Sequence, residues 1–256
     1  MVTDEIEAAL RTGPKFIYVL PNFHNPTGVT IPRERRVSLI ELADHYGVPI
    51  VEDDPYGQLR YEGEHIPAIE VLDSQMHHNG CCYTGNVIYL STFSKLLAPG
   101  IRLAWVIAPP EVIRKMVMAK QGADLHTATF NQIVAYEVSR GGFLDQHVQK
   151  INAIYRERRD VMLETLSEHM PEGVRWTRPK GGLFLWVTLP QGMSSTELFR
   201  TALAQKVAFV PGDSFYPYGG GENTMRLNYS NAKPERINEG IARLARAVKD
   251  QIARHN

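Results

Sequence analysis

The chain has 256 residues, of which 43% are hydrophobic and 22% charged, which is enough for a sizeable core in one or two domains. Its 28 lysines and arginines balance 28 aspartates and glutamates, which excludes the basic excess that attracts nucleic acid or an anionic membrane. No apolar run approaches the roughly 18 residues of a membrane span, and no signal peptide opens the chain. The only cysteines are the adjacent Cys81 and Cys82. We therefore expect a cytoplasmic protein that binds neither nucleic acid nor membranes.

Apolar runs bounded by turn residues predict strands in the first half of the chain, at residues 15–20, 49–51, 87–90 and 103–108. Between the first two, Thr30 is a candidate N-cap and Gly47 a candidate C-cap of a helix with Pro32 in its first turn. Residues 63–85 are rich in Gly, His and Asp and are expected to form a linker. Strand, helix and strand at this spacing are typical of a parallel sheet, which binds ligands outside the carboxyl ends of its strands.

From Leu144 onward, apolar residues at helical spacing predict a long helix that ends before residues 171–173. Its charged run, residues 156–159, is expected to form a solvated face. Short strands at 182–187, 207–210 and 224–229 follow, and an amphipathic helix closes the chain with Ile237, Ile241, Leu244 and Val248. We therefore expect two domains, residues 1–150 and a smaller α+β domain at 151–256.

Several chemically useful side chains follow the strand at 87–90, namely Thr92, Ser94, Lys95 and Arg102. A lysine just beyond a buried strand is expected to be poorly hydrated, which favours the uncharged amine. Such an amine can form a Schiff base with an aldehyde. Hydroxyls and an arginine beside it suit a phosphate dianion. The combination predicts an aldehyde cofactor that carries a phosphate, which is pyridoxal 5'-phosphate.

Two other motifs lie beyond the ends of predicted strands, Asn25-Pro26-Thr27-Gly28 and Asp53-Asp54-Pro55-Tyr56, and Arg226 lies within the predicted strand at 224–229. Each alone has a plainer explanation: a turn, a helix cap and a surface ion pair. Taken together, in this order and spacing, they make the chain similar to the fold-type I pyridoxal-phosphate enzymes. Within these enzymes it resembles the class I and II aminotransferases, in the subgroup of α-aminoadipate and kynurenine aminotransferases.

The resemblance implies a role for each candidate residue. Lys95 corresponds to the lysine that forms the Schiff base and moves the substrate proton, and Asp53 to the carboxylate that pairs with the pyridine nitrogen. Tyr56 and Asn25 correspond to the hydrogen-bond donors to the ring oxygen, and Arg226, with Asn25, to the site of the substrate α-carboxylate. The phosphate ligands are Thr92, Ser94 and Arg102. No metal site is expected, because His77 and His78 lack a third ligand at suitable spacing.

The resemblance also implies the transferase fold of these enzymes: a large domain with a mixed, mostly parallel sheet, and a smaller α+β domain. It implies a cis Asn25–Pro26 bond, a homodimer, and ping-pong transfer of an amino group between an L-amino acid and a 2-oxo acid. Relative to that family, the chain lacks the N-terminal segment that carries a Gly/Ser phosphate loop and a stacking aromatic residue. We therefore expect an incomplete large domain, weakened cofactor binding and an exposed sheet edge.

Two other functions remain open at this point. A lyase or decarboxylase on the same fold would use the same lysine and aspartate. The ligand-sensing domain of a transcription regulator built on an aminotransferase-like domain would need a DNA-binding segment upstream. The balanced charge of this chain does not favour DNA binding.

Overall fold

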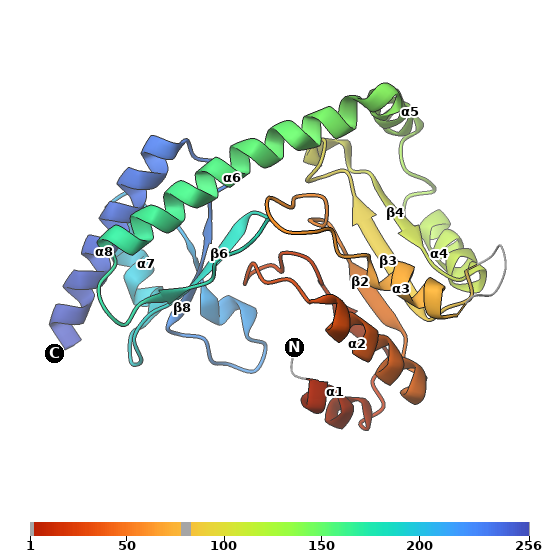
Figure 1. The fold of residues 1–256 in the computed structure, drawn as a ribbon, viewed down its shortest axis with the longest axis horizontal. Coiled ribbons are helices and arrows are strands. Elements are labelled where there is room, and N and C mark those ends of the chain that lie inside the picture. Colours follow the sequence, from red (N-terminus) through yellow and green to blue (C-terminus); the bar gives the residue numbers. More distant parts are fainter. Residues whose placement is uncertain (1–2, 78–82, 256) are drawn as a thin grey trace. The chain divides into compact units, whose positions relative to one another are not determined.

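The computed structural model describes residues 3–77 and 83–255, which form two compact units (Figure 1). The first unit contains the residues up to Asn22 together with Thr30–Gln149, and the second contains Phe23–Val29 and Lys150–Asn256. The helix α6 (Phe143–His169) begins in the first unit and ends in the second. That these units are a cofactor-binding domain and a small domain stays a prediction.

The first unit is built on a four-stranded sheet of order β1 (Ile17–Val19), β2 (Ile50–Asp53), β3 (Val87–Thr92) and β4 (Ala104–Ile107). The first three strands are parallel, and β4 runs antiparallel to β3. The predicted mixed, mostly parallel sheet is therefore confirmed.

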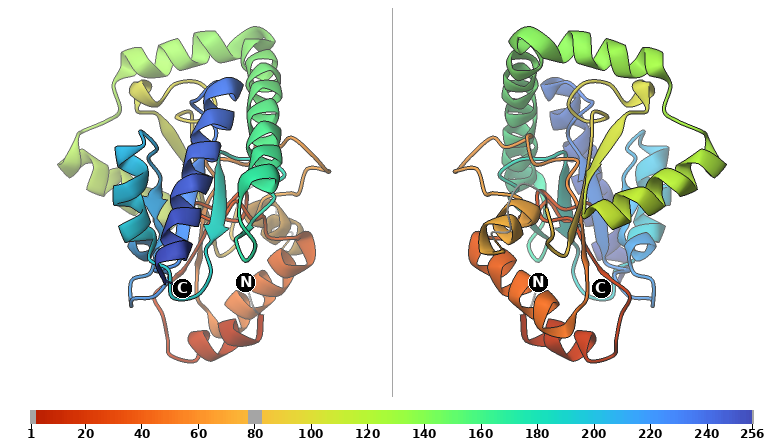
Figure 2. Two further views of the ribbon diagram at one scale, coloured as in Figure 1. Left: turned by 90° about the vertical axis from the view of Figure 1, so that its left-hand side faces the viewer. Right: turned by 90° about the vertical axis from the view of Figure 1, so that its right-hand side faces the viewer.

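Helices α1 (Thr3–Leu10), α2 (Arg33–Tyr46) and α3 (Ile69–Met76) pack in sequence, α1 on α2 and α2 on α3 (Figures 1 and 2). Apolar residues of α2, α3 and the three parallel strands form one buried cluster, which contains Val19, Leu39, Ile40, Ala43, Ile50, Ile69, Leu72 and Val87. Removing these side chains from water is the main stabilising contribution in this unit.

Two boundaries in this unit differ from the sequence prediction. The N-cap of α2 is Pro32, not Thr30, because a proline disfavours helical backbone in the residue before it. Gly47 ends the helix in the left-handed conformation with φ 62°, as predicted. The expected linker at 63–85 contains α3, whose eight residues show too short an apolar pattern to predict a helix.

Helices α4 (Pro110–Ala123) and α5 (Thr129–Ser139) follow β4, and the sequence analysis did not predict either of them. They bury few side chains among the described residues, and several of their large apolar residues are exposed. In β4, Ala104 and Ile107 are exposed, and β3 is the strand that pairs with it in the described part of the chain. The predicted exposed sheet edge is therefore present in these residues.

The second unit holds an antiparallel sheet of order β5 (Arg175–Trp176), β6 (Phe184–Thr188), β8 (Thr224–Asn228) and β7 (Val210–Pro211). Helix α7 (Ser195–Ala204) lies between β6 and β7 in sequence, and α8 (Pro234–His255) closes the chain. The four apolar residues predicted for one face of α8 are all buried, at positions 237, 241, 244 and 248. This α+β arrangement agrees with the fold expected for the second half.

The charged run of α6 is solvated only in part. Arg156 and Glu157 are exposed, but Arg159 is 3% exposed and donates from Nη1 to the carbonyl oxygen of Pro179 over 2.8 Å. The prediction of a solvated face was therefore wrong for Arg159, because its long side chain reaches a backbone acceptor inside the unit. None of the helices in the described residues combines the length and apolar composition that a membrane span needs.

Candidate active site

The predicted cofactor residues of the first unit gather at the carboxyl ends of two neighbouring parallel strands. Asp53 is the last residue of β2 and is paired in register with Leu90 of β3. Thr92 is the last residue of β3, and Ser94 and Lys95 lie in the turn that follows. Because parallel strands present their carboxyl ends at one edge of a sheet, the topology brings Asp53 and the Thr92–Lys95 turn to the same edge.

The two hydroxyls of this turn form one polar cluster. Oγ1 of Thr92 lies 2.9 Å from Oγ of Ser94 and accepts the backbone N–H of Ser94 over 3.1 Å. It also lies 3.0 Å from the carbonyl oxygen of Leu103, which fastens the turn to the start of β4. Both residues are half-buried, so their hydroxyls are held in place and still reachable by a ligand.

Lys95 and Arg102 are both exposed in the described structure. The expectation that Lys95 is poorly hydrated is therefore wrong here, because Lys95 occupies an exposed position of the turn after β3. Arg102 has left-handed backbone, with φ 51°, and donates from Nη1 to the carbonyl oxygen of Pro99 over 3.1 Å. Its guanidinium keeps further donors that can bind a phosphate.

The Asp53 carboxylate accepts a hydrogen bond that the sequence analysis did not predict. The hydroxyl of Tyr18, in β1, donates to Oδ2 of Asp53 over 2.5 Å. Burial, together with this hydrogen bond, raises the pKa of Tyr18 above its ordinary value. Tyr56, three residues after Asp53, is buried and close enough to Tyr18 to contribute electrostatically to that shift.

Asp54, the neighbour of Asp53, belongs to the scaffold of the first unit. It is buried, and its Oδ1 accepts a hydrogen bond from Nδ2 of Asn22 over 3.0 Å. Its carbonyl oxygen accepts the Ser91 hydroxyl over 3.0 Å. Burial raises the pKa of the Asp54 carboxyl. These bonds connect the segment after β2 to β3 and to the segment after β1.

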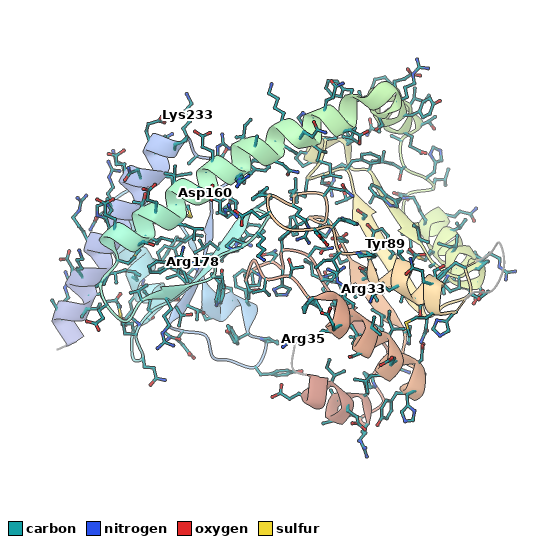
Figure 3. The ribbon with its side chains drawn as sticks, viewed as in Figure 1. Arg33, Arg35, Tyr89, Asp160, Arg178 and Lys233 are labelled. Carbon is teal, nitrogen blue, oxygen red and sulfur yellow. The ribbon has the colours of Figure 1, made fainter. Side chains whose placement is uncertain are left out.

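A buried arginine that the sequence analysis did not single out organises the same loops. Arg36 is fully buried in α2. Arg33 and Arg35 of the same helix, both labelled in Figure 3, are exposed. The Arg36 guanidinium donates to Oδ1 of Asn22 over 2.6 Å and to the carbonyl oxygens of Ile31 (2.9 Å) and Pro67 (2.8 Å). Burial lowers the pKa of Arg36.

Glu52, the residue before Asp53, is also fully buried. Its carboxylate accepts the backbone N–H groups of Ile69 over 2.8 Å and Glu70 over 2.9 Å, at the start of α3. Burial raises the pKa of Glu52 to about 7. A side chain 17 residues earlier in the chain thus binds free N–H groups in the first turn of α3.

The second unit holds the other two predicted residues. The Asn25–Pro26 bond is cis, as the resemblance implied. Nη1 of Arg226, in β8, donates to Oδ1 of Asn25 over 2.7 Å. The Arg226 guanidinium lies 4.3 Å from the centre of the Phe184 ring and 5.4 Å from that of Phe215. Cation–π contacts of this kind fix the plane of a guanidinium, and therefore the direction of its remaining donors.

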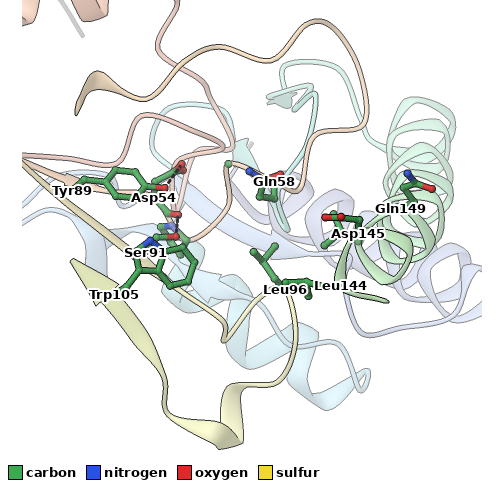
Figure 4. Close-up of a pocket in the computed structure, with 12 residues that line it drawn as sticks. Asp54, Gln58, Tyr89, Ser91, Leu96, Trp105, Leu144, Asp145 and Gln149 are labelled. Atoms are coloured by element: carbon green, nitrogen blue, oxygen red, sulfur yellow. Dashed lines mark hydrogen bonds between the residues drawn. The ribbon is translucent and has the colours of Figure 1, made fainter. Parts of the chain in front are cut away.

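A cavity of about 670 Å³ in the first unit is a separate feature (Figure 4). Its lining includes Asp54, Tyr89, Ser91 and Trp105, and contains no predicted cofactor residue. Tyr89 and Ser91 alternate along β3 with Leu90 and Thr92, so the cavity opens on the sheet face opposite to that of Thr92.

His77 lies between two carboxylates of the first unit. Its Nε2 is 3.1 Å from Oδ2 of Asp44, and its Nδ1 is 3.0 Å from Oδ1 of Asp73. Asp44, Asp73 and His77 each offer one oxygen or nitrogen atom, and these atoms lie within 4.8 Å of one another. The fold therefore brings to His77 two carboxylates that its spacing in the sequence did not indicate. The other residues of interest nearby, His78, Cys81 and Cys82, lie outside the described residues.

The donor set of the first unit fits the predicted cofactor. A carboxylate at the end of β2 suits a protonated pyridine nitrogen, and two clustered hydroxyls with a nearby guanidinium suit a phosphate. An accessible lysine amine, Lys95, lies one residue beyond those hydroxyls. The chemistry of these residues therefore agrees with pyridoxal 5'-phosphate.

Comparisons with known proteins agree with this chemistry. The mixed sheet, with polar side chains at the carboxyl ends of its parallel strands, defines an α/β protein with the fold of pyridoxal-phosphate-dependent transferases. A family model described as aminotransferase class I and II matches residues 2–244. The chain belongs to that family.

Among its relatives is the aromatic-amino-acid aminotransferase 1 of Thermococcus litoralis, which is 48% identical over 238 residues. That alignment covers 93% of this chain and 55% of the relative. The crystal structure of the α-aminoadipate aminotransferase LysN from Thermus thermophilus, in complex with N-(5'-phosphopyridoxyl)-L-leucine, superposes with a TM-score of 0.91 at 43% identity. It covers 98% of this chain and 63% of the solved one. The chain thus spans less than two thirds of these relatives.

A more distant relative has a different described role. An uncharacterized HTH-type transcriptional regulator of Bacillus subtilis is 31% identical over 242 residues, which cover 94% of this chain and 48% of the regulator. The enzyme relatives are therefore clearly more similar to this chain than the regulator is.

Proposed function

We propose that the chain carries out amino-group transfer between an L-amino acid and a 2-oxo acid with pyridoxal 5'-phosphate as cofactor. The observation that carries this proposal is the position of Asp53 and the Thr92–Lys95 turn at the carboxyl ends of neighbouring parallel strands. Membership of the aminotransferase family and 48% identity to an aromatic-amino-acid aminotransferase support it.

The residues that would hold the cofactor follow from their chemistry. In the first unit, the Asp53 carboxylate would pair with the ring nitrogen, and the hydroxyl of Tyr56 would donate to the ring oxygen. The hydroxyls of Thr92 and Ser94 and the guanidinium of Arg102 would bind the phosphate.

The chain's own residues then supply the chemistry of proton movement and substrate binding. Bound pyridoxal 5'-phosphate supplies an aldehyde that takes up the substrate amino group and a ring that accepts the electron pair released at Cα. Nζ of Lys95 accepts the proton from Cα and returns it on the cofactor side, as a general base and then a general acid. Arg226 binds the substrate α-carboxylate through its guanidinium. The same residues then act on the 2-oxo acid, which gives ping-pong kinetics.

We propose aromatic or aminoadipate-type amino acids as the substrates. The relatives described above carry these names, which is what supports the substrate class. We also propose a cytoplasmic homodimer. Large apolar side chains exposed on α4 and α5, such as Phe130 at 75% exposure, offer area for a subunit contact. Sedimentation equilibrium of the purified chain tests the dimer.

The experiment that tests the proposed function is reductive trapping of the cofactor. The purified chain is mixed with pyridoxal 5'-phosphate, its visible spectrum is recorded, and borohydride is added. We expect a Lys95-dependent absorption band and, after reduction, a stable mass increase on the peptide that contains Lys95. The Lys95→Ala and Lys95→Arg variants should show neither. Trapping on other lysines to the same extent in all three proteins would contradict the proposal.

Product analysis separates transfer from the other reactions of this fold. Transfer requires a second 2-oxo acid as acceptor and converts it to an amino acid. Release of carbon dioxide would indicate a decarboxylase, and release of ammonia without an acceptor would indicate a lyase. Specific DNA binding by the chain, in place of turnover, would indicate the regulator function.

A further inference from the structure

The hydroxyl of Tyr18 and the carboxylate of Asp53 are brought together by the register of the sheet. Tyr18 pairs with Val51 in the parallel β1–β2 ladder. Asp53 lies two residues beyond Val51, and side chains two apart on a strand point to the same face. Tyr18 therefore lies on the same face as Asp53, and its phenol is long enough to reach the end of the neighbouring strand. The distance from Oη to Oδ2 is 2.5 Å.

This bond leaves the two carboxylate oxygens of Asp53 in different environments. Oδ2 receives the Tyr18 hydroxyl, whereas Oδ1 receives no side-chain hydrogen bond from residues 3–77 or 83–255. The Tyr18 side chain is 57% exposed, so its ring contributes little to the core, and the fixed part is its hydroxyl. The ring of Tyr18 is exposed, but its hydroxyl end lies against Asp53 and is partly shielded from water. This shielding and the Asp53 carboxylate raise the pKa of Tyr18, so the hydroxyl keeps its proton and remains a donor at neutral pH.

We propose that Tyr18 is a positioning residue, whose hydroxyl holds Oδ2 of Asp53 and so leaves Oδ1 as the acceptor for the cofactor's ring nitrogen. The inference rests on the proposed function. Two effects follow from the bond. It restricts rotation of the carboxylate, and it keeps Oδ2 occupied by a donor, so that the ring nitrogen meets Oδ1. Sequence reasoning missed Tyr18 because a tyrosine within a short apolar run is usually a sheet residue.

The test compares cofactor affinity in four proteins: the wild type, Tyr18→Phe, Asp53→Asn and the double variant. The dissociation constant of pyridoxal 5'-phosphate is measured by absorbance titration of each unliganded protein. We expect Tyr18→Phe to weaken binding about 10-fold, as for loss of a hydrogen bond to a charged group. In the Asp53→Asn background, the same change should have little effect, because the group that Tyr18 positions is already altered.

Tyr46→Phe is the matched control. The Tyr46 hydroxyl also donates to a carboxylate of the first unit, Oε1 of Glu7, over 2.9 Å, and Glu7 is not a predicted cofactor residue. We expect this variant to bind the cofactor as the wild type does. Urea unfolding of each variant shows whether any loss of affinity reflects loss of folded protein.

A measurement without cofactor tests the pair itself. The ¹³Cζ chemical shift of Tyr18 at pH 7, assigned by its absence in Tyr18→Phe, should differ between Asp53→Asn and the wild type, because the hydroxyl loses its charged acceptor. An unchanged chemical shift would show that the hydroxyl does not contact Asp53, and would overturn the inference.

The outcomes distinguish this inference from the proposed function. If the wild type binds no cofactor, the proposed function fails, and the role of Tyr18 fails with it. If the wild type binds and Tyr18→Phe binds equally well, only the role of Tyr18 is overturned. Equal losses of cofactor affinity in Tyr18→Phe and Tyr46→Phe would also overturn the role of Tyr18, because the effect would then not depend on the contact with Asp53.

Discussion

Nη1 of Arg226 donates to Oδ1 of Asn25 over 2.7 Å, and this bond joins β8 to a loop 201 residues earlier in the chain. The two residues belong to the same unit, although the sequence separates them by most of its length. An arginine carries its five N–H donors in a planar fork, so the bond fixes the orientation of the guanidinium. The contact therefore serves both the folding of the second unit and the proposed binding of substrate.

Replacing Asn25 by alanine should destabilise the second unit. The change removes the acceptor of a half-buried guanidinium, and a hydrogen bond to a charged group contributes about 1.5–3 kcal/mol. We expect the free energy of unfolding, measured in urea, to fall by about 1.5 kcal/mol. Asn25→Asp keeps an acceptor oxygen and should retain most of this stability. An alanine variant as stable as the wild type would show that the bond contributes nothing in solution.

Gly28→Ala should be more destabilising than an alanine at another glycine with the same backbone conformation. Gly28 has φ +72°, and an added Cβ would lie 2.6 Å from the carbonyl oxygen of Phe184. Left-handed backbone costs about 1–2 kcal/mol in a non-glycine residue, and overpacking adds about 1–3 kcal/mol. Gly13→Ala is the matched control, because Gly13 has φ +70° and no atom within 4 Å of the added Cβ.

Thermal or urea unfolding measures both glycine variants. We expect Gly13→Ala to lose only the stability that left-handed backbone costs an alanine. The free energy of unfolding of Gly28→Ala should therefore be at least about 1 kcal/mol lower than that of Gly13→Ala. Equal losses of unfolding free energy in the two variants would indicate that the loop containing Gly28 moves away from Phe184 without losing stability.

The strands that carry the candidate site were predictable from sequence, because each is an apolar run bounded by turn residues. Those boundaries located Asp53 and Lys95 at strand ends before the fold was known. Helix α3 could not be predicted in the same way, because Glu52, far away in sequence, binds the free N–H groups of its first turn. The hydrogen bond of Tyr18 depends on the register of β1 against β2, which no local pattern specifies.

The buried arginines show that a run of charged residues does not indicate which of its members will be buried. Arg33, Arg35 and Arg36 stand together in one charged run, and the third alone is fully buried. Its position on the face of α2 and the carbonyl groups of distant loops decide its burial, and neither is visible in the composition of the run. For the same reason, the charged run at residues 156–159 did not indicate that Arg159 is buried.

Replacing Arg36 by methionine should destabilise the first unit strongly. Methionine is unbranched and apolar but shorter, and it has no donor, so the oxygens of Asn22, Ile31 and Pro67 would lose their partner. Each buried acceptor left unpaired costs about 1–3 kcal/mol, and we expect a total loss of about 3–5 kcal/mol in the free energy of unfolding. Arg33→Met, at an exposed position of the same helix, should change stability by less than about 0.5 kcal/mol. Similar effects of the two variants would contradict the role of Arg36.

Glu52→Gln should change how stability depends on pH. Burial raises the pKa of Glu52 from 4.5 to about 7, so between these values the folded state holds a proton that the unfolded state releases. The stabilisation is therefore fully present below about pH 4.5 and is lost as the pH rises through 7. A shift of this size corresponds to about 3 kcal/mol. Glutamine removes the titration and keeps an oxygen acceptor for α3.

Urea unfolding of the wild type and Glu52→Gln at a series of pH values from 4.5 to 8 measures this difference. Other titrating groups are common to both proteins and cancel in the comparison. Relative to the variant, the wild type should lose about 3 kcal/mol across this range. Glu64→Gln, which replaces an exposed carboxylate in the same unit, is the control and should follow the wild-type curve. Parallel curves for the wild type and Glu52→Gln would mean that the carboxylate is ionised throughout, and that the N–H groups of α3 stabilise the charge enough to offset its burial.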